Sequence, residues 1–193
     1  MENIVPSRVE ALVLFRQYNK SESLLKHALT VEAVMRHFAA IYDEGNIEKW
    51  GIVGLVHDLD YEMFPEQHCL KVREILTSAQ WPEDYIHAIE SHGLGLCADV
   101  EPEHYMEKVL FTIDELTGLI TAAALLRPSK SVLDLEVKSV KKKWKDARFA
   151  AGVNRGVIEQ GTEMLDLELE FIIDETIKGM LEAAAEIGLQ GSL

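Results

Sequence analysis

Apolar residues recur at helical spacing along most of the chain. The best-defined stretch follows Ser21, where one face of a helix would carry Leu24, Ala28, Val31, Phe38 and Ile41. Ser21 is a suitable N-terminal cap, because its hydroxyl oxygen accepts a hydrogen bond from a backbone N–H of the first turn. The pattern therefore predicts a long amphipathic helix that begins near Ser21.

The same periodicity predicts further helices over residues 48–59, 65–79, 82–92, 105–126, 137–145, 155–165 and 167–187. Pro65 and Pro82 stand where a helix can begin, and Pro128 stops the helix before it. Alternating strand-like runs joined by hairpin turns do not occur in the sequence. We expect a single all-α domain over residues 1–193, a helical bundle with a core of about 21–126 on which C-terminal helices of about 129–189 pack.

Composition narrows the possible partners. The 19 basic and 33 acidic residues give a formal net charge of −14, which disfavours binding to a nucleic-acid polymer. No apolar run approaches the roughly 18 residues of a membrane span, and the N-terminus lacks a secretory signal pattern. We therefore expect a cytoplasmic protein with no membrane partner. Cys69 and Cys97 are expected to be reduced and packed in the core.

Polar residues inside these apolar patterns are the candidates for chemistry. His57 and Asp58 end a short apolar run, and a buried carboxylate needs a partner such as a cation. His27 faces the apolar stripe of its own helix, and Asp114 lies within an apolar helical segment. Imidazole and carboxylate ligands together suit Mn, Fe, Co, Ni or Zn, and a set of two His and two Asp leaves coordination positions open for water and substrate.

Each of these residues also has an ordinary structural explanation. His27 alone fits a hydrogen-bonded core histidine, and Asp114 alone fits a cap or an ion pair. Adjacent helical residues point about 100° apart, so His57 and Asp58 bind one ion together only at a helix end or with the ion between them. His37 nearly matches His27 in helical angle but lies almost three turns further along, so His27 is the preferred ligand.

The ordered set of His27, His57-Asp58 and Asp114 resembles the HD superfamily of metal-dependent phosphohydrolases. Within it, a subgroup of predicted bacterial hydrolases of the HDIG type, with undetermined substrate, resembles this chain over about residues 24–189. The segments that carry the resemblance are LVHDLDY, DYEMFPEQH, AIESHG, DELTGLI and KSVKKKWKDARFAAGVNR. The resemblance implies an HD-domain-like bundle.

It also implies that His27, His57, Asp58 and Asp114 hold one or two divalent ions, Mg included. In members with two ions, the aspartate of the pair bridges them and further histidines bind the second ion. His68 and His92 match that role, or alternatively that of donors to a substrate phosphate.

Four other residues are candidates for catalysis or substrate binding. Asp60 and Glu62 follow the paired ligands and could orient water or act as general acid or base, although solvation of a helix end also explains them. Lys142 and Arg155, in and after a basic segment, could hold substrate phosphate; the alternative is a solvated helix face.

The expected function is hydrolysis of a phosphate ester or anhydride of a small metabolite, a nucleotide above all, by metal-activated water. A di-iron oxygenase with the same fold and a non-catalytic, ligand-sensing domain are the alternatives. A small phosphorylated substrate is the expected partner, and both a monomer and a homodimer remain open.

Overall fold

A computed structural model describes residues 4–192 of the protein. Over this range it contains nine α-helices, two short 3-10 helices and no β-strand, which confirms the all-α prediction. The α-helices are α1 (Arg8–Tyr18), α2 (Glu22–Tyr42), α3 (Ile47–Val56), α4 (Leu70–Ser78), α5 (Glu83–Ser91), α6 (Tyr105–Leu125), α7 (Val137–Trp144), α8 (Arg155–Leu165) and α9 (Leu169–Glu182). The 3-10 helices are η1 (Glu44–Asn46) and η2 (Pro65–Gln67).

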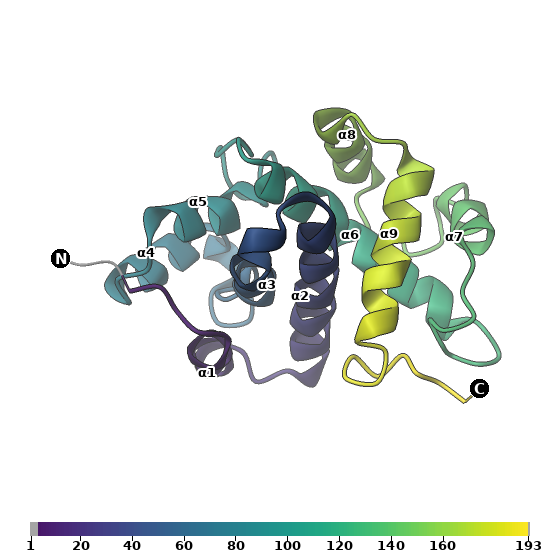
Figure 1. Ribbon diagram of the computed structural model, residues 1–193, viewed down its shortest axis with the longest axis horizontal. Coiled ribbons are helices and arrows are strands. Elements are labelled where there is room, and N and C mark those ends of the chain that lie inside the picture. Colours follow the sequence, from purple (N-terminus) through teal and green to yellow (C-terminus); the bar gives the residue numbers. More distant parts are fainter. Residues whose placement is uncertain (1–3, 193) are drawn as a thin grey trace.

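Helices α2 and α6 form the centre of the molecule. α2 packs against α3, α6 and α9, and α6 also carries α8. Figure 1 shows α1, α3, α4 and α5 on one side of α2, and α7, α8 and α9 on the other. The largest fully buried side chains lie both in these two central helices and in the neighbouring helices α1 and α3, and they include Trp50, Phe15, Phe38, Phe111 and Met35.

α1 was not predicted from the hydrophobic pattern. It begins with a capping box, in which the hydroxyl oxygen of Ser7 accepts from the backbone N–H of Glu10 and the Glu10 carboxylate accepts from the backbone N–H of Ser7. The helix buries Ala11 and Phe15 in the core. The apolar stripe of this helix is weak, because only two of its residues are buried. The Ser-x-x-Glu spacing of the capping box is the sequence signal that could have revealed the helix.

The predicted helix over residues 65–79 is wrong, because the chain breaks inside it. η2 ends at Gln67, Cys69 takes a positive φ of 67°, and α4 begins at Leu70. The fully buried Asp60 causes the break, since its carboxylate accepts from the backbone N–H of Val72 at 2.8 Å and pairs with the ring of His68. The last helix is also shorter than the predicted range of 167–187, because α9 begins at Leu169 and ends at Glu182.

The expectation of two reduced cysteines is wrong as well. Cys69 and Cys97 form a disulfide that joins the start of α4 to the loop after α5, with 5.9 Å between their Cα atoms. The two residues are 28 positions apart, and only the antiparallel packing of α4 on α5 brings them together. Among the described residues, no helix has the length and apolar character needed to cross a membrane.

Candidate metal centre

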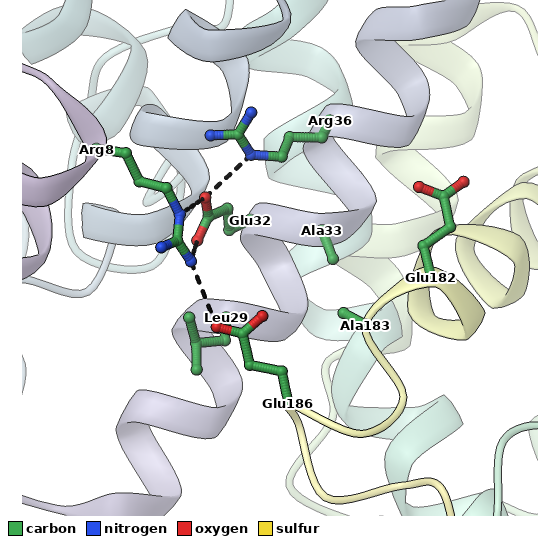
Figure 2. Close-up of a pocket in the computed structure, with 8 residues that line it drawn as sticks. All are labelled: Arg8, Leu29, Glu32, Ala33, Arg36, Glu182, Ala183 and Glu186. Carbon is green, nitrogen blue, oxygen red and sulfur yellow. Dashed lines mark hydrogen bonds and ion pairs between the residues drawn. The ribbon is translucent and has the colours of Figure 1, made fainter.

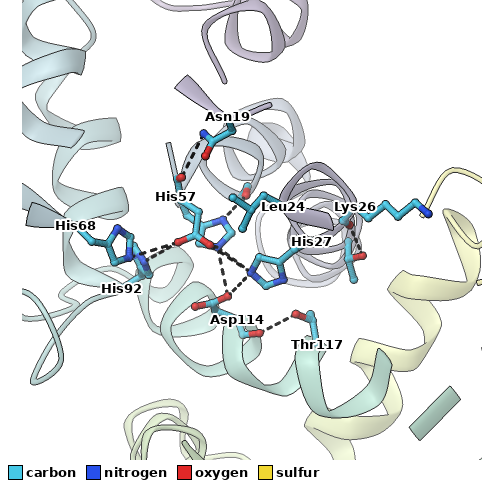
Figure 3. Close-up of polar contacts among 12 residues, drawn as sticks. Asn19, Leu24, Lys26, His27, His57, His68, His92, Asp114 and Thr117 are labelled. Carbon is cyan, nitrogen blue, oxygen red and sulfur yellow. Dashed lines mark hydrogen bonds and ion pairs between the residues drawn. The ribbon is translucent and has the colours of Figure 1, made fainter. Parts of the chain in front are cut away.

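Three residues of the predicted ligand set, His27, His57 and Asp114, meet between α2, the end of α3, and α6 (Figure 3). The fourth, Asp58, contacts both histidines. His27 Nε2 lies 2.9 Å from Asp114 Oδ1 and 3.2 Å from His57 Nε2. His57 Nε2 lies 3.3 Å from the same Asp114 oxygen and 3.4 Å from Asp58 Oδ2. Ligand atoms that share one ion, with bonds of about 2.0–2.2 Å, lie roughly 3.0–3.5 Å apart. One ligand atom each of His27, His57 and Asp114 lies within 4.8 Å of the other two, as atoms that could hold one ion do, and Asp58 Oδ2 lies 3.7 Å from His27 Nε2.

The end of α3 sets the direction of the paired ligands. Nδ1 of the fully buried His57 lies 2.8 Å from the carbonyl oxygen of Gly54, which can only accept, so Nδ1 carries the proton and Nε2 is free to bind a cation. A Cβ at Gly54 would lie 2.9 Å from the Met35 side chain and 3.1 Å from the carbonyl oxygen of Val31. Only glycine lets α3 approach α2 closely enough to bring His57 beside His27.

A second group of ligand atoms adjoins the first through Asp58. While Oδ2 of Asp58 faces His57, its Oδ1 lies 3.4 Å from Nε2 of His68 and 3.8 Å from Nε2 of His92. Nδ1 of His92 donates to the carbonyl oxygen of Ile89, and Nδ1 of His68 pairs with Asp60 at 2.7 Å. Both rings thus present Nε2 toward one carboxylate oxygen. The two oxygens of Asp58 thus face different histidines, and Asp58 lies between the two groups of candidate ligands.

The electrostatics of the cluster keep its carboxylates ionised. Burial opposes the charge of Asp114, but the neighbouring His57 and His27 outweigh it and hold the pKa of Asp114 well below its usual range. Burial likewise opposes protonation of His57, and the nearby carboxylates overcome this and raise the pKa of His57 well above its usual value. The carboxylates that raise this pKa would also attract a cation, so a cation and a proton would compete for the same side of His57.

His92 differs from His57 in its charge. Burial, together with the neighbouring His57, lowers the pKa of His92, so its ring is neutral near pH 7. A neutral imidazole is the form that binds metal ions. His68 and His92 thus lie in a group of side chains that could hold a metal ion, and the neutral ring of His92 suits that role.

The ligand cluster opens into a cavity of about 350 Å³. Besides the ligands, its lining is largely apolar and includes Leu24, Leu96, Phe111, Val157, Tyr61 and Glu115. In the part of the chain that the structure describes, no lysine or arginine lines this cavity. Lys26 directly precedes His27 in α2, and its side chain points away from His27 and Asp114 (Figure 3).

Two predicted catalytic carboxylates do not reach the cavity. Asp60 is fully buried and holds His68 and Val72, so it acts behind the ligand shell. Glu62 accepts from the backbone N–H groups of Lys20 and Ser21 at 2.8 and 3.0 Å, and thereby fixes the start of α2. Neither carboxylate is placed to act on a substrate.

The structure does not bring the predicted phosphate-binding residues to the cavity either. Lys142 lines a separate cavity beside Arg127 and Ser139. The guanidinium of Arg155 donates to the carbonyl oxygens of Trp144, Asp146 and Phe149, at 2.7–3.1 Å. Arg155 therefore holds the loop after α7 in place, and the basic segment lies outside the site.

Sequence reasoning missed two residues that shape the site. Asn19 is fully buried, and its side-chain amide donates to the carbonyl oxygen of Leu59 at 2.8 Å, which fixes the turn that carries Asp58. Tyr61 lies edge-on to the ring of His68, with 5.1 Å between ring centroids, and lines the cavity. A lone Asn between two helices gives no sequence signal, whereas Tyr61 stood in the segment already singled out.

Comparisons with protein-family models, with curated proteins and with solved structures give no match for this chain. The proposal of a function therefore depends on the geometry of the site and on the pattern of residues that form it.

Proposed function

We propose that the protein is a metal-dependent phosphohydrolase of the HD type that acts on a small phosphomonoester. The observation that carries the proposal is the position of Asp58, which turns one oxygen toward His57 and the other toward His68 and His92. Ligand groups that share a bridging carboxylate suit a pair of divalent ions. Such ions, when bound, acidify a water molecule and withdraw charge from a phosphoryl oxygen.

The chain itself contributes orientation and exclusion of solvent. The carbonyl oxygen of Gly54 and the carboxylate of Asp60 each bind the Nδ1 side of a ligand histidine, and so aim Nε2 of His57 and of His68 at the site. Phe111, which is buried, and Val157 form apolar walls that limit the access of bulk water. Fixed ligands in a partly dry cavity strengthen every charge interaction with a bound phosphate.

The walls of the cavity also limit the charge of the substrate. A triphosphate carries several negative charges that basic side chains normally pair. No lysine or arginine among the described residues lines the cavity, so no cationic side chain there would pair with a substrate phosphate, and its charge would be left to cations held by the His and Asp ligands. A single phosphoryl group on a largely uncharged small molecule, such as a nucleoside monophosphate, fits this balance better than a polyphosphate.

The test is phosphate release from a panel of nucleoside monophosphates, sugar phosphates and nucleoside triphosphates, with Mn²⁺, Co²⁺, Zn²⁺ or Mg²⁺ supplied. We expect activity on monophosphates that is lost in His57→Ala. Protein that holds metal by elemental analysis, and yet releases no phosphate from any member of the panel, would refute the proposal.

The cavity also supports a second candidate, an oxygen-dependent di-iron enzyme. Histidine and carboxylate ligands with a bridging Asp suit iron, and an apolar cavity without basic residues does not require a phosphorylated substrate. Iron-loaded, reduced protein that consumes dioxygen with a candidate substrate, but releases no phosphate, would favour this reading. Metal-loaded protein that is inactive in both assays would leave a non-catalytic, ligand-sensing domain as the remaining alternative.

A further inference from the structure

The disulfide between Cys69 and Cys97 lies directly beside the second group of ligands. Cys69 follows His68 in the chain, and one ligand atom from each of Cys69, His68 and His92 lies within 4.8 Å of the others. A Cβ at Gly93 would stand 2.4 Å from Sγ of Cys69 and 2.5 Å from Sγ of Cys97. The glycine therefore lets both sulfur atoms lie against the backbone that immediately follows His92.

The two cysteines are held in different ways. Cys69 is fully buried, and the same carboxylate of Asp60 anchors the chain on both sides of it, at the His68 ring and at the Val72 N–H. Cys97 is partly exposed, in a loop whose neighbouring Leu96 is also exposed. If the disulfide is broken, Cys69 keeps its place beside the histidines, while Cys97 is the more exposed of the two residues.

We propose that this disulfide controls the coordination of the second metal position. In the disulfide form, the position has His68, His92 and the shared Asp58 as its ligands. After reduction, the sulfur of Cys69 becomes a fourth ligand. The inference rests on the metal site of the proposed function and extends it with a ligand that only the reduced protein has.

The redox step balances with a dithiol as reductant. The dithiol gives two electrons and two protons to the disulfide, the S–S bond of the protein breaks, and the reductant forms its own disulfide. The thiol proton of Cys69 then passes to solvent as the sulfur binds the cation, because the thiolate is the form that binds metals. Cys97 remains a free thiol.

The added ligand changes what the second position can do. Two imidazoles, a carboxylate and a thiolate form a closed tetrahedral set, which is typical of structural zinc sites, whereas three ligands leave a position open for water or substrate. A soft thiolate also shifts preference toward Zn²⁺ and Co²⁺ and away from Mg²⁺ and Mn²⁺. The disulfide form is therefore the more active one, and the reduced form holds its second ion more tightly.

Cobalt substitution tests the coordination without reference to activity. Thiolate-bound Co²⁺ absorbs in the near ultraviolet by sulfur-to-metal charge transfer, while histidine- and carboxylate-bound Co²⁺ shows only weak visible bands. Cys97→Ser leaves Cys69 permanently free, and Cys69→Ser is its matched control. We expect the charge-transfer band in the dithiol-reduced wild type and in Cys97→Ser, and not in the oxidised wild type or in Cys69→Ser.

Three results would overturn the inference. The first is cobalt bound to Cys97→Ser and to the reduced wild type without the band, and the second is the same band in Cys69→Ser. The third is a thiol count that stays at two after mild oxidation of the native protein. Phosphate release is measured separately, so a protein that shows the band but no hydrolysis retains this inference and loses only the proposed reaction.

A chelator competition gives an independent measure. Zinc should leave the oxidised wild type at least about tenfold more readily than the reduced protein, since loss of one thiolate weakens the site. Cys69→Ser should show no such dependence on redox state. An equal rate of zinc loss in both redox states of the wild type would contradict the proposed ligand.

Discussion

At the scale of single residues, the site depends most on Asp58. Its two oxygens face different groups of histidines. Without a positive partner, burial would favour the protonated, neutral form of this side chain. Burial works against the ionised form, but the adjacent His57 holds the pKa of Asp58 far below its ordinary value. The residue is thus kept as a carboxylate in a position where a neutral group would cost less free energy.

Replacement of Asp58 by Asn tests this role. The amide keeps the shape of the side chain but removes its charge, so both ions should be lost and activity should fall at least about 100-fold. Metal content by elemental analysis and phosphate release are the measurements. The exposed Glu66→Gln, from the same segment, should change neither, and retention of two ions by Asp58→Asn would contradict a bridging carboxylate.

Replacement of Asp60 by Asn should affect the second ligand group and leave the first unchanged. The variant weakens the hold on His68 and on the N–H of Val72, but does not touch His27 or Asp114. We expect the second ion to bind about 10–100-fold more weakly, as is typical when the partner of a ligand histidine is removed. Titration with Co²⁺ followed by absorption would show one tight and one weak site, and two unchanged sites would argue against the positioning role of Asp60.

At the scale of helices, a network of ion pairs joins α1, α2 and α3. Figure 2 shows Glu32 of α2 between the guanidinium groups of Arg8 and Arg36. Arg8 Nε lies 2.6 Å and Arg36 Nε 3.0 Å from the same oxygen of Glu32, and Arg36 continues to Glu48. The side chain of Glu32 is only 4 % exposed, so the charge depends on both arginines.

Glu32→Gln should lower the free energy of unfolding by about 1–3 kcal/mol, because two charged hydrogen-bonding partners are left with a neutral acceptor. Urea unfolding of metal-free protein measures this. Glu186→Gln is the matched control: Glu186 contacts Arg8 at 3.4 Å but is 56 % exposed, and its loss should cost less than about 1 kcal/mol. Equal costs for the two variants would mean that burial of Glu32 adds nothing.

A second contact, between α2 and α9, should make stability depend on pH. Burial opposes the charge of Glu175, but Lys178 and His37 outweigh it and lower the pKa of Glu175 below its ordinary value of 4.5. A carboxylate with a depressed pKa stabilises the fold above the unfolded value and loses this effect as the pH falls through the folded value. Glu175→Gln should therefore lower the melting temperature at pH 7, and the difference should vanish below its folded pKa. A difference that persists in acid would exclude the ionic contribution.

The helices show what the pattern of the chain can and cannot specify. Ser21, Pro82 and Pro128 mark helix ends by local chemistry, and helices were predicted close to where they occur in α2, α5 and α6. The break at Cys69 follows from a tertiary contact of Asp60, so no local signal announces it. The positions of Lys142 and Arg155 depend on how α7 and α8 pack on the centre, which a helical period does not determine.

At the scale of the whole molecule, the ligand atoms come from elements that are far apart in the sequence. α2 provides His27, the turn after α3 provides His57 and Asp58, and α6 provides Asp114. The segments before α4 and at the end of α5 provide His68 and His92. The order of the first ligands was readable from the sequence, because each is a polar residue inside an apolar pattern. His68 was predicted at the site only through the family resemblance, because the helical pattern over residues 65–79 gave no reason of its own to place it there.

Because the ligands join so many elements, cation binding should stabilise the entire fold. A ligand that binds only the folded state at 100 times its Kd adds about 2.7 kcal/mol, which raises the melting temperature by several degrees in a protein of this size. We expect the melting temperature to rise with added Co²⁺ or Mn²⁺ and to return to its starting value when a chelator removes the ion. Asp114→Asn keeps the size of the side chain but removes a ligand charge, so its melting temperature should respond far less. An equal rise in this variant would place the stabilising cation elsewhere, and the convergence of these six side chains would then have a structural explanation alone.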